Sequence, residues 1–281
     1  VEKTGIKYIY KSSKNETALS LALNAARKLK FNKNDIDILI YVTQSPVYQL
    51  PTNACIIQDN LNLKKKIMTF DVNQGCSGFL YGLNIAQKLF LKKKNSKVLL
   101  ICSDTYTKNI DYRDKSCSTI FSDGATATLL NNNNKWLNNF FFYTDGSGYK
   151  DLFLENSEQS CINGNKQKLY MNGKKVLLFT MSAIPDLVKN LLKKENLLIK
   201  DKKYFIFHQA SKIVLDNLPR KLEIPSNKVF RNFETIGNTV SSTIPISLIK
   251  LKKKKLIKKG DKILLCGFGV GLSASATIMK V

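Results

Sequence analysis

Cys76 is the residue best placed in the sequence to act as a nucleophile. It lies in DVNQGCSGF (71–79), between an expected buried strand at MTFDV (68–72) and a helix whose apolar face begins at Phe79. Free N–H groups and the dipole at a helix start stabilise a thiolate, so we expect a lowered pKa at Cys76 and the fastest alkylation of any cysteine. The alternative is a small buried core cysteine, which is what most free cysteines are.

The only histidine, His208, and the amide of Asn238 are the other candidates for a catalytic role. His208 follows the apolar run YFIF (204–207), which places it at the end of an expected strand and not on a solvated face. Its alternative is a hydrogen-bonded core histidine, because buried polar groups are commonly satisfied by structural contacts. A thiol, an imidazole and an amide that converge on one point would form a catalytic site.

An internal repeat relates these positions to one another. In each half a strand, a turn and an amphipathic helix follow in the same order, and Cys76 in the first half corresponds closely to Asn238 in the second. The matching segments are 35–63 with 201–224, 70–104 with 231–269, and 119–130 with 271–281.

The repeat predicts one α/β unit built from two similar halves, residues 1–143 and residues 144–281. Strands that alternate with helices of this length imply layered sheets with helices between and outside them. In such folds, reactive groups gather at strand ends and helix starts. The duplication would therefore bring Cys76, His208 and Asn238 to comparable corners.

The net charge of +24 invites a nucleic-acid interpretation, which the composition does not favour. Nearly all basic residues are lysine, and lysine and asparagine are abundant together, which indicates a coding bias. No RNA- or DNA-binding motif accompanies the charge, so we expect no nucleic-acid partner. An acidic partner protein fits the charge.

The cysteines and the apolar runs limit which other classes of protein fit the sequence, namely metal-binding, secreted and membrane proteins. The six cysteines form no CxxC pair and there is one histidine, so we expect no metal site and reduced thiols in a cytoplasmic protein. The sequence contains no run of 18 apolar residues, so we expect no membrane span. The chain opens without the apolar region of a secretory signal.

Six short segments in the same order resemble the β-ketoacyl-acyl-carrier-protein synthase III family of the thiolase superfamily. The resemblance implies a thiolase-like fold with αβαβα layers. Family members have a first strand and helix ahead of TGI (4–6) that are absent here, so the chain looks N-terminally short. The segments are KTGI, DVNQGCSGF, FSDGATATLL, FHQAS, GNTVSSTIPISL and GFGVGLS.

The resemblance also implies a reaction, namely acyl transfer followed by decarboxylative condensation. Cys76 would take an acyl group from acyl-coenzyme A or an acyl carrier protein, and backbone N–H groups of Cys76 and Val270 would form the oxyanion hole. His208 and Asn238 would stabilise the enolate of a malonyl thioester. Degradative thiolases use a second cysteine; Cys266 is the one possible match, and synthesis is favoured. No resident cofactor is implied.

Further residues take expected roles from the resemblance alone. Lys3 matches a position that contacts coenzyme A, and Leu50 matches one that reaches into the acyl pocket of a partner subunit. The strand after FSDGA would pair across the two-fold axis of a homodimer. Three basic residues on the helix after FHQAS would dock the acyl carrier protein: Lys212, Arg220 and Lys221. Chance is an equal explanation of that cluster in so lysine-rich a chain.

Two other functions stay open at this point. One is an acyltransferase of a glycan or specialised-metabolite pathway that does not condense, and the other is a non-catalytic scaffold of the same fold.

Asp71, Asp104 and Asp123 lie near strand ends, where they are interpreted as turn and cap residues. The acyl chain length and the pathway, whether fatty-acid or other, are not predicted.

Overall fold

The first half of the chain forms a four-stranded sheet of order β2-β1-β3-β4. The computed structural model describes residues 4–90, 96–132, 137–155 and 168–281. Three strands are parallel and β4 is antiparallel to β3. The strands are β1 (Ile36–Val42), β2 (Met68–Val72), β3 (Lys97–Asp104) and β4 (Gly124–Asn131).

The strand expected at 68–72 is confirmed in its bounds, and its burial is not as expected. β2 is an edge strand, because it pairs only with β1 among the described strands. Its residues are half-buried, and Met68 is exposed. An apolar run in the sequence does not distinguish an edge strand from a central one.

The second half forms another four-stranded sheet, of order β5-β10-β9-β8. β10 is antiparallel to both neighbours, and β8 is parallel to β9. The predicted boundary at residues 143 and 144 cuts β5, which belongs whole to this sheet, so the second half begins ahead of Leu137. The strands are β5 (Leu137–Thr144), β8 (Tyr204–Phe207), β9 (Lys262–Gly269) and β10 (Ser273–Lys280).

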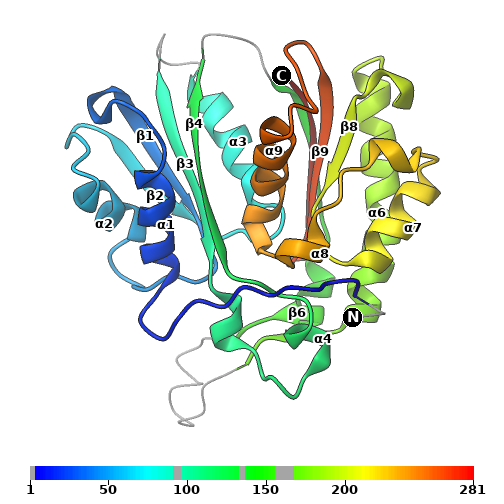
Figure 1. Cartoon of the computed structure of the whole chain (residues 1–281), viewed down its shortest axis with the longest axis horizontal. Coiled ribbons are helices and arrows are strands. Elements are labelled where there is room, and N and C mark those ends of the chain that lie inside the picture. The colour runs from blue at the N-terminus through cyan, green and yellow to red at the C-terminus, as the bar shows by residue number, and fades with distance from the viewer. Residues whose placement is uncertain (1–3, 91–95, 133–136, 156–167) are drawn as a thin grey trace.

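Helices lie between the two sheets and on both outer faces, which gives the αβαβα layers expected (Figure 1). The layer between the sheets contains α3 (Gly78–Leu89) and α9 (Thr243–Lys253). The outer helices are α1 (Ala18–Arg27) and α2 (Asn53–Asn60) on the first sheet, and α6 (Gly173–Lys194) and α7 (Lys212–Lys221) on the second. Among the short elements, α4 (Lys115–Ser118) and β6 (Leu152–Phe153) lie at the lower end of Figure 1, and α8 (Phe233–Ile236) lies beneath α9. A further short strand, β7 (Tyr170–Met171), pairs with β6.

The central helices bury apolar side chains against both sheets at once. Leu80 and Leu83 of α3 share one core cluster with Ile40 of the first sheet and Leu265 of the second. Gly82 lets α3 approach β3 closely, because a Cβ at this position would lie 2.6 Å from the side chain of Leu100. Separate clusters fill the spaces under the outer helices. Among the described residues, no helix is both long and apolar enough to cross a bilayer.

Candidate active site

Cys76, His208 and Asn238 line one cavity, whose volume is about 910 Å³. Cys76 lies just ahead of α3, and His208 follows the last residue of β8. Asn238 lies in the loop between α8 and α9. Most of the remaining lining is apolar and includes Phe121 and Phe268. The duplicated fold thus brings the three predicted residues together, as expected.

The glycines around Cys76 are explained by the crowding of the backbone there. A Cβ at Gly269, the last residue of β9, would lie 2.9 Å from Sγ of Cys76. A Cβ at Gly75 would overlap the side chains of Val270 and Gln44. Glycine at both positions allows the start of α3 and the end of β9 to meet at the sulfur.

The expected lowering of the Cys76 pKa is wrong for this structure. Burial raises the pKa of the thiol to about 12, and the charge of Asp104 adds to the rise. The backbone N–H groups of Val270 and Cys76 act in the opposite direction with a smaller effect. Desolvation outweighs the favourable position ahead of a helix. These two N–H groups, expected to form an oxyanion hole, do lie where they interact with the sulfur.

His208 is buried and neutral. Burial lowers the pKa of its imidazole to about 3. Its Nδ1 lies 2.7 Å from Oγ1 of Thr243, and its ring meets that of Phe268 edge-on, with centroids 5.7 Å apart. Thr243 comes from the first turn of α9, so a helix of the central layer fixes the orientation of the imidazole. In the sequence, only its place in GNTVSSTIPISL (237–248) points to this threonine.

Asn238 is oriented by its own loop and by the first half. Its Oδ1 accepts a hydrogen bond from the backbone N–H of Val240 at 2.9 Å. Its backbone N–H donates to Ile120, and its carbonyl accepts from the N–H of Ser122. Because a backbone N–H can only donate, the amide oxygen must face Val240, which leaves the NH₂ group as a donor for the cavity.

Asp104 is a polar residue near the site whose importance the sequence does not indicate. It ends β3, is fully buried, and accepts hydrogen bonds of 2.7 Å from the N–H of Gln44 and from Oγ of Ser241. Burial raises the pKa of Asp104 to about 7. It therefore joins both halves beside Cys76 and is more than a turn residue. Asp71, in contrast, caps the start of α2 as expected, by accepting from the N–H groups of Asn53 and Ala54.

A second cavity, of about 380 Å³, lies beside the first, and Leu152 lines both. Its wall carries a polar pair in which the hydroxyl of Tyr106 donates to Oε1 of Gln44 at 2.5 Å. Val270 lines the same cavity. The space next to the nucleophile segment is therefore small and partly polar.

The three predicted docking residues lie at opposite ends of α7. Lys212 begins the helix beside the lining residues Ser211 and Ile213, and it pairs with Asp216 at 2.9 Å. Arg220 and Lys221 end it, about 12 Å away along the axis. Nζ of Lys221 donates to the carbonyl of Met181. Only Lys212 is thus near the mouth of the cavity.

Of the other residues taken from the resemblance, Leu50 and Cys266 do not line the cavity within this chain. Leu50 is 85% exposed, ahead of α2. Lys3 lies outside the described residues. Cys266 is buried within β9 in the core cluster under α6 and α7 and does not line the cavity. Among the described residues, no group of three or more His, Cys, Asp or Glu side chains could hold a metal ion.

Comparisons with known proteins agree with this geometry. Models of the N-terminal and C-terminal parts of 3-oxoacyl-[acyl-carrier-protein] synthase III match residues 70–146 and 192–281. A β-ketoacyl-[acyl-carrier-protein] synthase III of Clostridium tetani is 34% identical over 92% of this chain and 81% of its own length, and that of Clostridium novyi is 33% identical over 99% and 89%. A crystal structure of a 3-oxoacyl-(acyl-carrier-protein) synthase III, 35% identical, covers 100% of this chain and 90% of its own with a TM-score of 0.93. The chain belongs to the β-ketoacyl-[acyl-carrier-protein] synthase III family.

Proposed function

We propose that this protein is an acyltransferase that condenses an acyl group held on Cys76 with a malonyl thioester, giving a β-ketoacyl product. The observation that carries the proposal is the meeting of a thiol, a neutral imidazole and an amide NH₂ on one largely apolar cavity. Such a cavity excludes water, which would otherwise hydrolyse an acyl-enzyme.

In the first half-reaction, the sulfur of Cys76 attacks the carbonyl carbon of the acyl thioester. The new thioester bond forms as the old one breaks, and the departing coenzyme A or carrier thiol leaves with the proton that the Cys76 thiol loses. The N–H groups of Cys76 and Val270 are the donors that would hold the negative oxygen of the tetrahedral intermediate. Because burial raises the pKa of this thiol, a bound substrate must favour the loss of its proton.

In the second half-reaction, a malonyl thioester loses carbon dioxide and the resulting enolate carbon attacks the acyl group on Cys76. Hydrogen bonds from Nε2–H of His208 and from the NH₂ of Asn238 stabilise the enolate oxygen. The sulfur of Cys76 leaves and takes up a proton, which restores the thiol. A neutral imidazole suits this role, since it donates a hydrogen bond without a net charge to compensate.

The experiment follows each half-reaction separately. Label from radioactive acyl-coenzyme A should appear on Cys76 and be absent in Cys76→Ala. In His208→Ala and Asn238→Ala this labelling should largely persist, while condensation falls about a hundredfold or more through the loss of one aimed donor. Equal damage to both half-reactions would contradict the proposed roles of His208 and Asn238. No label on Cys76 would contradict the function itself.

The proposed partners follow from the surface. The acyl carrier protein would dock at the basic residues of α7, and no resident cofactor is needed by this chemistry.

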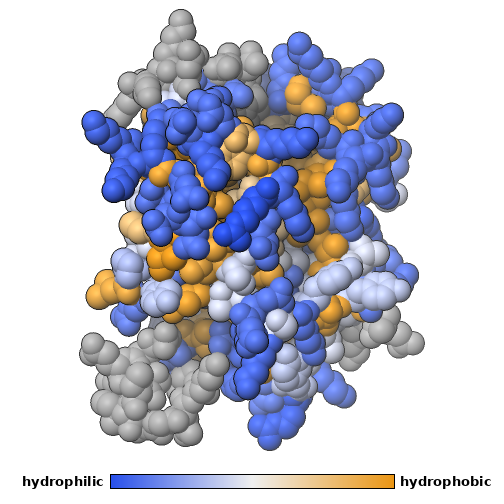
Figure 2. Space-filling model, turned by 60° about the vertical axis from the view of Figure 1, so that its left-hand side comes forward, coloured by the Kyte–Doolittle hydropathy of each residue, from blue (hydrophilic) through white to orange (hydrophobic). Residues whose placement is uncertain are grey.

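A homodimer would cover the exposed apolar residues beside β2, which are Val47, Tyr48, Leu50 and Met68. Figure 2 shows apolar patches across the middle of the face that includes this side. Sedimentation at micromolar concentration should give a dimer; a monomer would contradict this assembly. The pairing of β4 across a two-fold axis, expected from the resemblance, is a different interface, because β4 lies at the opposite edge of the first sheet from β2. That pairing and a cytoplasmic location stay predictions.

A non-condensing acyltransferase and a non-catalytic scaffold are not favoured. The scaffold would not require Cys76, His208 and Asn238 to line the same cavity, and a simple acyltransferase would not require a pair of donors for an enolate. The family to which the chain belongs is a family of condensing enzymes.

A further inference from the structure

A cavity of about 920 Å³ lies at the other end of the second sheet. It is lined by Tyr204, the first residue of β8, whereas His208 follows the last. About 13 Å of extended chain separate these two residues. The cavity shares no lining residue with the one that contains Cys76. It is therefore separate from the proposed active site.

Lys202, which lines this cavity, is in an unusual environment for a lysine. The residue is 1% exposed, and its Nζ has no hydrogen-bond partner among the described residues. Burial lowers the pKa of its amino group to about 8. A buried amino group without a partner is costly, so a position of this kind normally has an apolar residue or an ion pair.

The first half of the chain has an apolar residue at the same place. The turn Lys33–Asp35 precedes β1 as the turn Ile199–Asp201 precedes β8. The next residue is Ile36 in the first half and Lys202 in the second, and both are buried. The duplicated fold thus shows that this corner needs no lysine for its structure.

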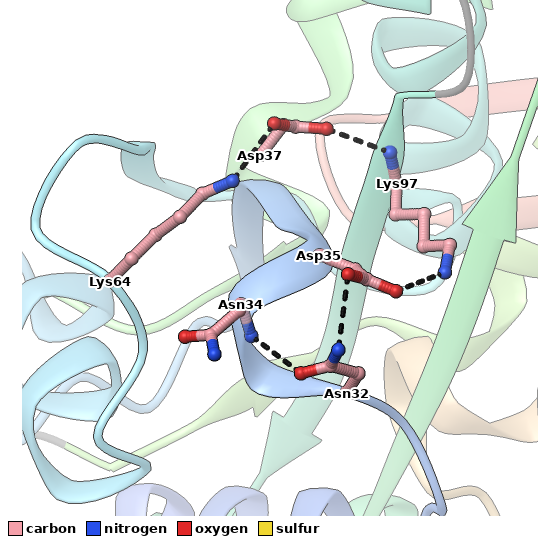
Figure 3. Close-up of polar contacts among 6 residues, drawn as sticks. All are labelled: Asn32, Asn34, Asp35, Asp37, Lys64 and Lys97. Carbon is pink, nitrogen blue, oxygen red and sulfur yellow. Dashed lines mark hydrogen bonds and ion pairs between the residues drawn. The ribbon is translucent and has the colours of Figure 1, made fainter.

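Around Ile36, the neighbouring lysines are neutralised by aspartates (Figure 3). Nζ of Lys97 lies 2.6 Å from Asp35, and Nζ of Lys64 lies 3.1 Å from Asp37. Asp37 also accepts a hydrogen bond from the backbone N–H of Lys97. The corner in the first half is therefore a balanced set of charges around an apolar core position.

The corresponding corner of the second half carries an excess of positive charge. Lys203 is at the position that Asp37 has in the first half, just as Lys202 is at the position of Ile36. The carboxylates of Asp201 and Asp261 are engaged by the backbone N–H groups of Leu198 and Lys258. The charged residues that line the cavity are Lys200, Lys202, Lys203, Lys228 and Lys262 against Asp201 and Asp261.

We propose that this cavity binds a phosphate-bearing anion, which is attracted by the five lysines that line it and adds negative charge beside Nζ of Lys202, an amino group without a hydrogen-bond acceptor among the described residues. A phosphate group offers several strong acceptor oxygens and about two negative charges, and a lysine ammonium is a common phosphate ligand. Lys203 and Lys262 line the same cavity and add positive charge around the bound group.

The test uses the full chain and two variants that copy the first half. Sodium pyrophosphate and ADP are titrated calorimetrically into the wild type, Lys202→Ile and Lys203→Asp, at constant ionic strength. Lys202→Ile reproduces Ile36, and Lys203→Asp reproduces Asp37. We expect at least a tenfold loss of affinity in both variants, and no loss in Lys88→Ile, which removes an exposed lysine of α3. The tighter of the two ligands distinguishes an inorganic from a nucleotide source.

Thermal unfolding without added anion completes the test. Lys202→Ile should unfold at or above the temperature of the wild type, because it removes an unpaired buried amine. Pyrophosphate should raise the unfolding temperature of the wild type more than that of this variant. If neither ligand binds the wild type at millimolar concentration, or if all four proteins bind equally, the proposal is overturned. Should Lys202→Ile fail to fold, Lys203→Asp still decides the outcome.

Discussion

Thr243→Val should change the tautomer of His208 and slow condensation while leaving the shape of the site in place. The hydroxyl of Thr243 has one proton and two neighbouring acceptors, Nδ1 of His208 at 2.7 Å and the carbonyl of Val240 at 3.2 Å. When it donates to Nδ1, the ring proton must be on Nε2, and Nε2–H can stabilise an enolate. When it donates to Val240, the ring proton is on Nδ1 and Nε2 is a bare acceptor.

The shorter of the two distances favours donation to His208. Both side chains are buried, so removal of the hydroxyl leaves Nδ1 without a partner, at a cost of about 1–3 kcal/mol. If that cost is borne in the transition state, condensation slows by about fivefold to about a hundredfold. Valine has nearly the shape of threonine, which keeps the packing of α9. Thr243→Ser retains the hydroxyl and should recover most of the rate.

Nitrogen-15 NMR of histidine-labelled protein provides the direct assay, since the chain contains one histidine and therefore gives one pair of ring signals. We expect a neutral imidazole protonated at Nε2 in the wild type and in Thr243→Ser, and a change in Thr243→Val. Thr277→Val is a matched control, because it removes a buried hydroxyl that donates a 3.0 Å hydrogen bond to the carbonyl of Asn139 in the second sheet. Its loss of stability should be similar, without a change in the histidine signals.

Two results would refute this reasoning. One is a wild-type imidazole protonated at Nδ1, which would make Nε2 an acceptor and His208 a base for the Cys76 thiol. The other is a Thr243→Val enzyme whose condensation rate and histidine signals both equal those of the wild type.

Three further predictions concern the nucleophile, its surroundings and the carrier surface. Iodoacetamide should modify the exposed Cys55 before the buried Cys76, and mass mapping that found the reverse order would show that the pKa of Cys76 is not raised. Asp104 holds its proton more tightly in the folded state, with a pKa of about 7 against an ordinary 3.8, so wild-type stability should fall as the pH rises from about 4 to about 7. Asp104→Asn should lack this fall in thermal unfolding; parallel curves would contradict the buried charge. Charge reversal at Arg220 and Lys221 should raise KM for a carrier-linked substrate and spare a pantetheine thioester, whereas equal loss with both would exclude this docking surface.

The duplicated pattern in the sequence predicted the layers of the fold and the meeting of three distant residues. Cys76, His208 and Asn238 follow from local signals, a glycine-rich turn and two strand ends, whose places a repeated fold makes equivalent. The start of α3 was also predicted from a local signal, because the apolar residues of this helix recur with a clear helical period.

What the sequence could not supply depends on contacts between distant segments. The raised pKa of Cys76 results from burial and from the charge of Asp104. The residues next to Cys76 in the sequence predict neither how deeply the thiol is buried nor that Asp104, at the end of β3, lies near it. The boundary at residues 143 and 144 was misplaced because the residues of Leu137–Thr144 do not themselves indicate that this segment pairs with β10. Lys202 was overlooked since lysine is so common in this chain.

The shared central layer has a consequence for how the chain folds during synthesis. Leu80 and Leu83 of α3 complete their packing only with Ile206, Ile263 and similar residues, which leave the ribosome more than a hundred residues later at about 5–20 residues per second. The first half must therefore wait for several seconds with one apolar face of its sheet and helix uncovered. Contacts so far apart in the sequence also slow folding. The nascent chain should be a client of chaperones that bind apolar surfaces, and pausing of translation between the halves should increase its aggregation.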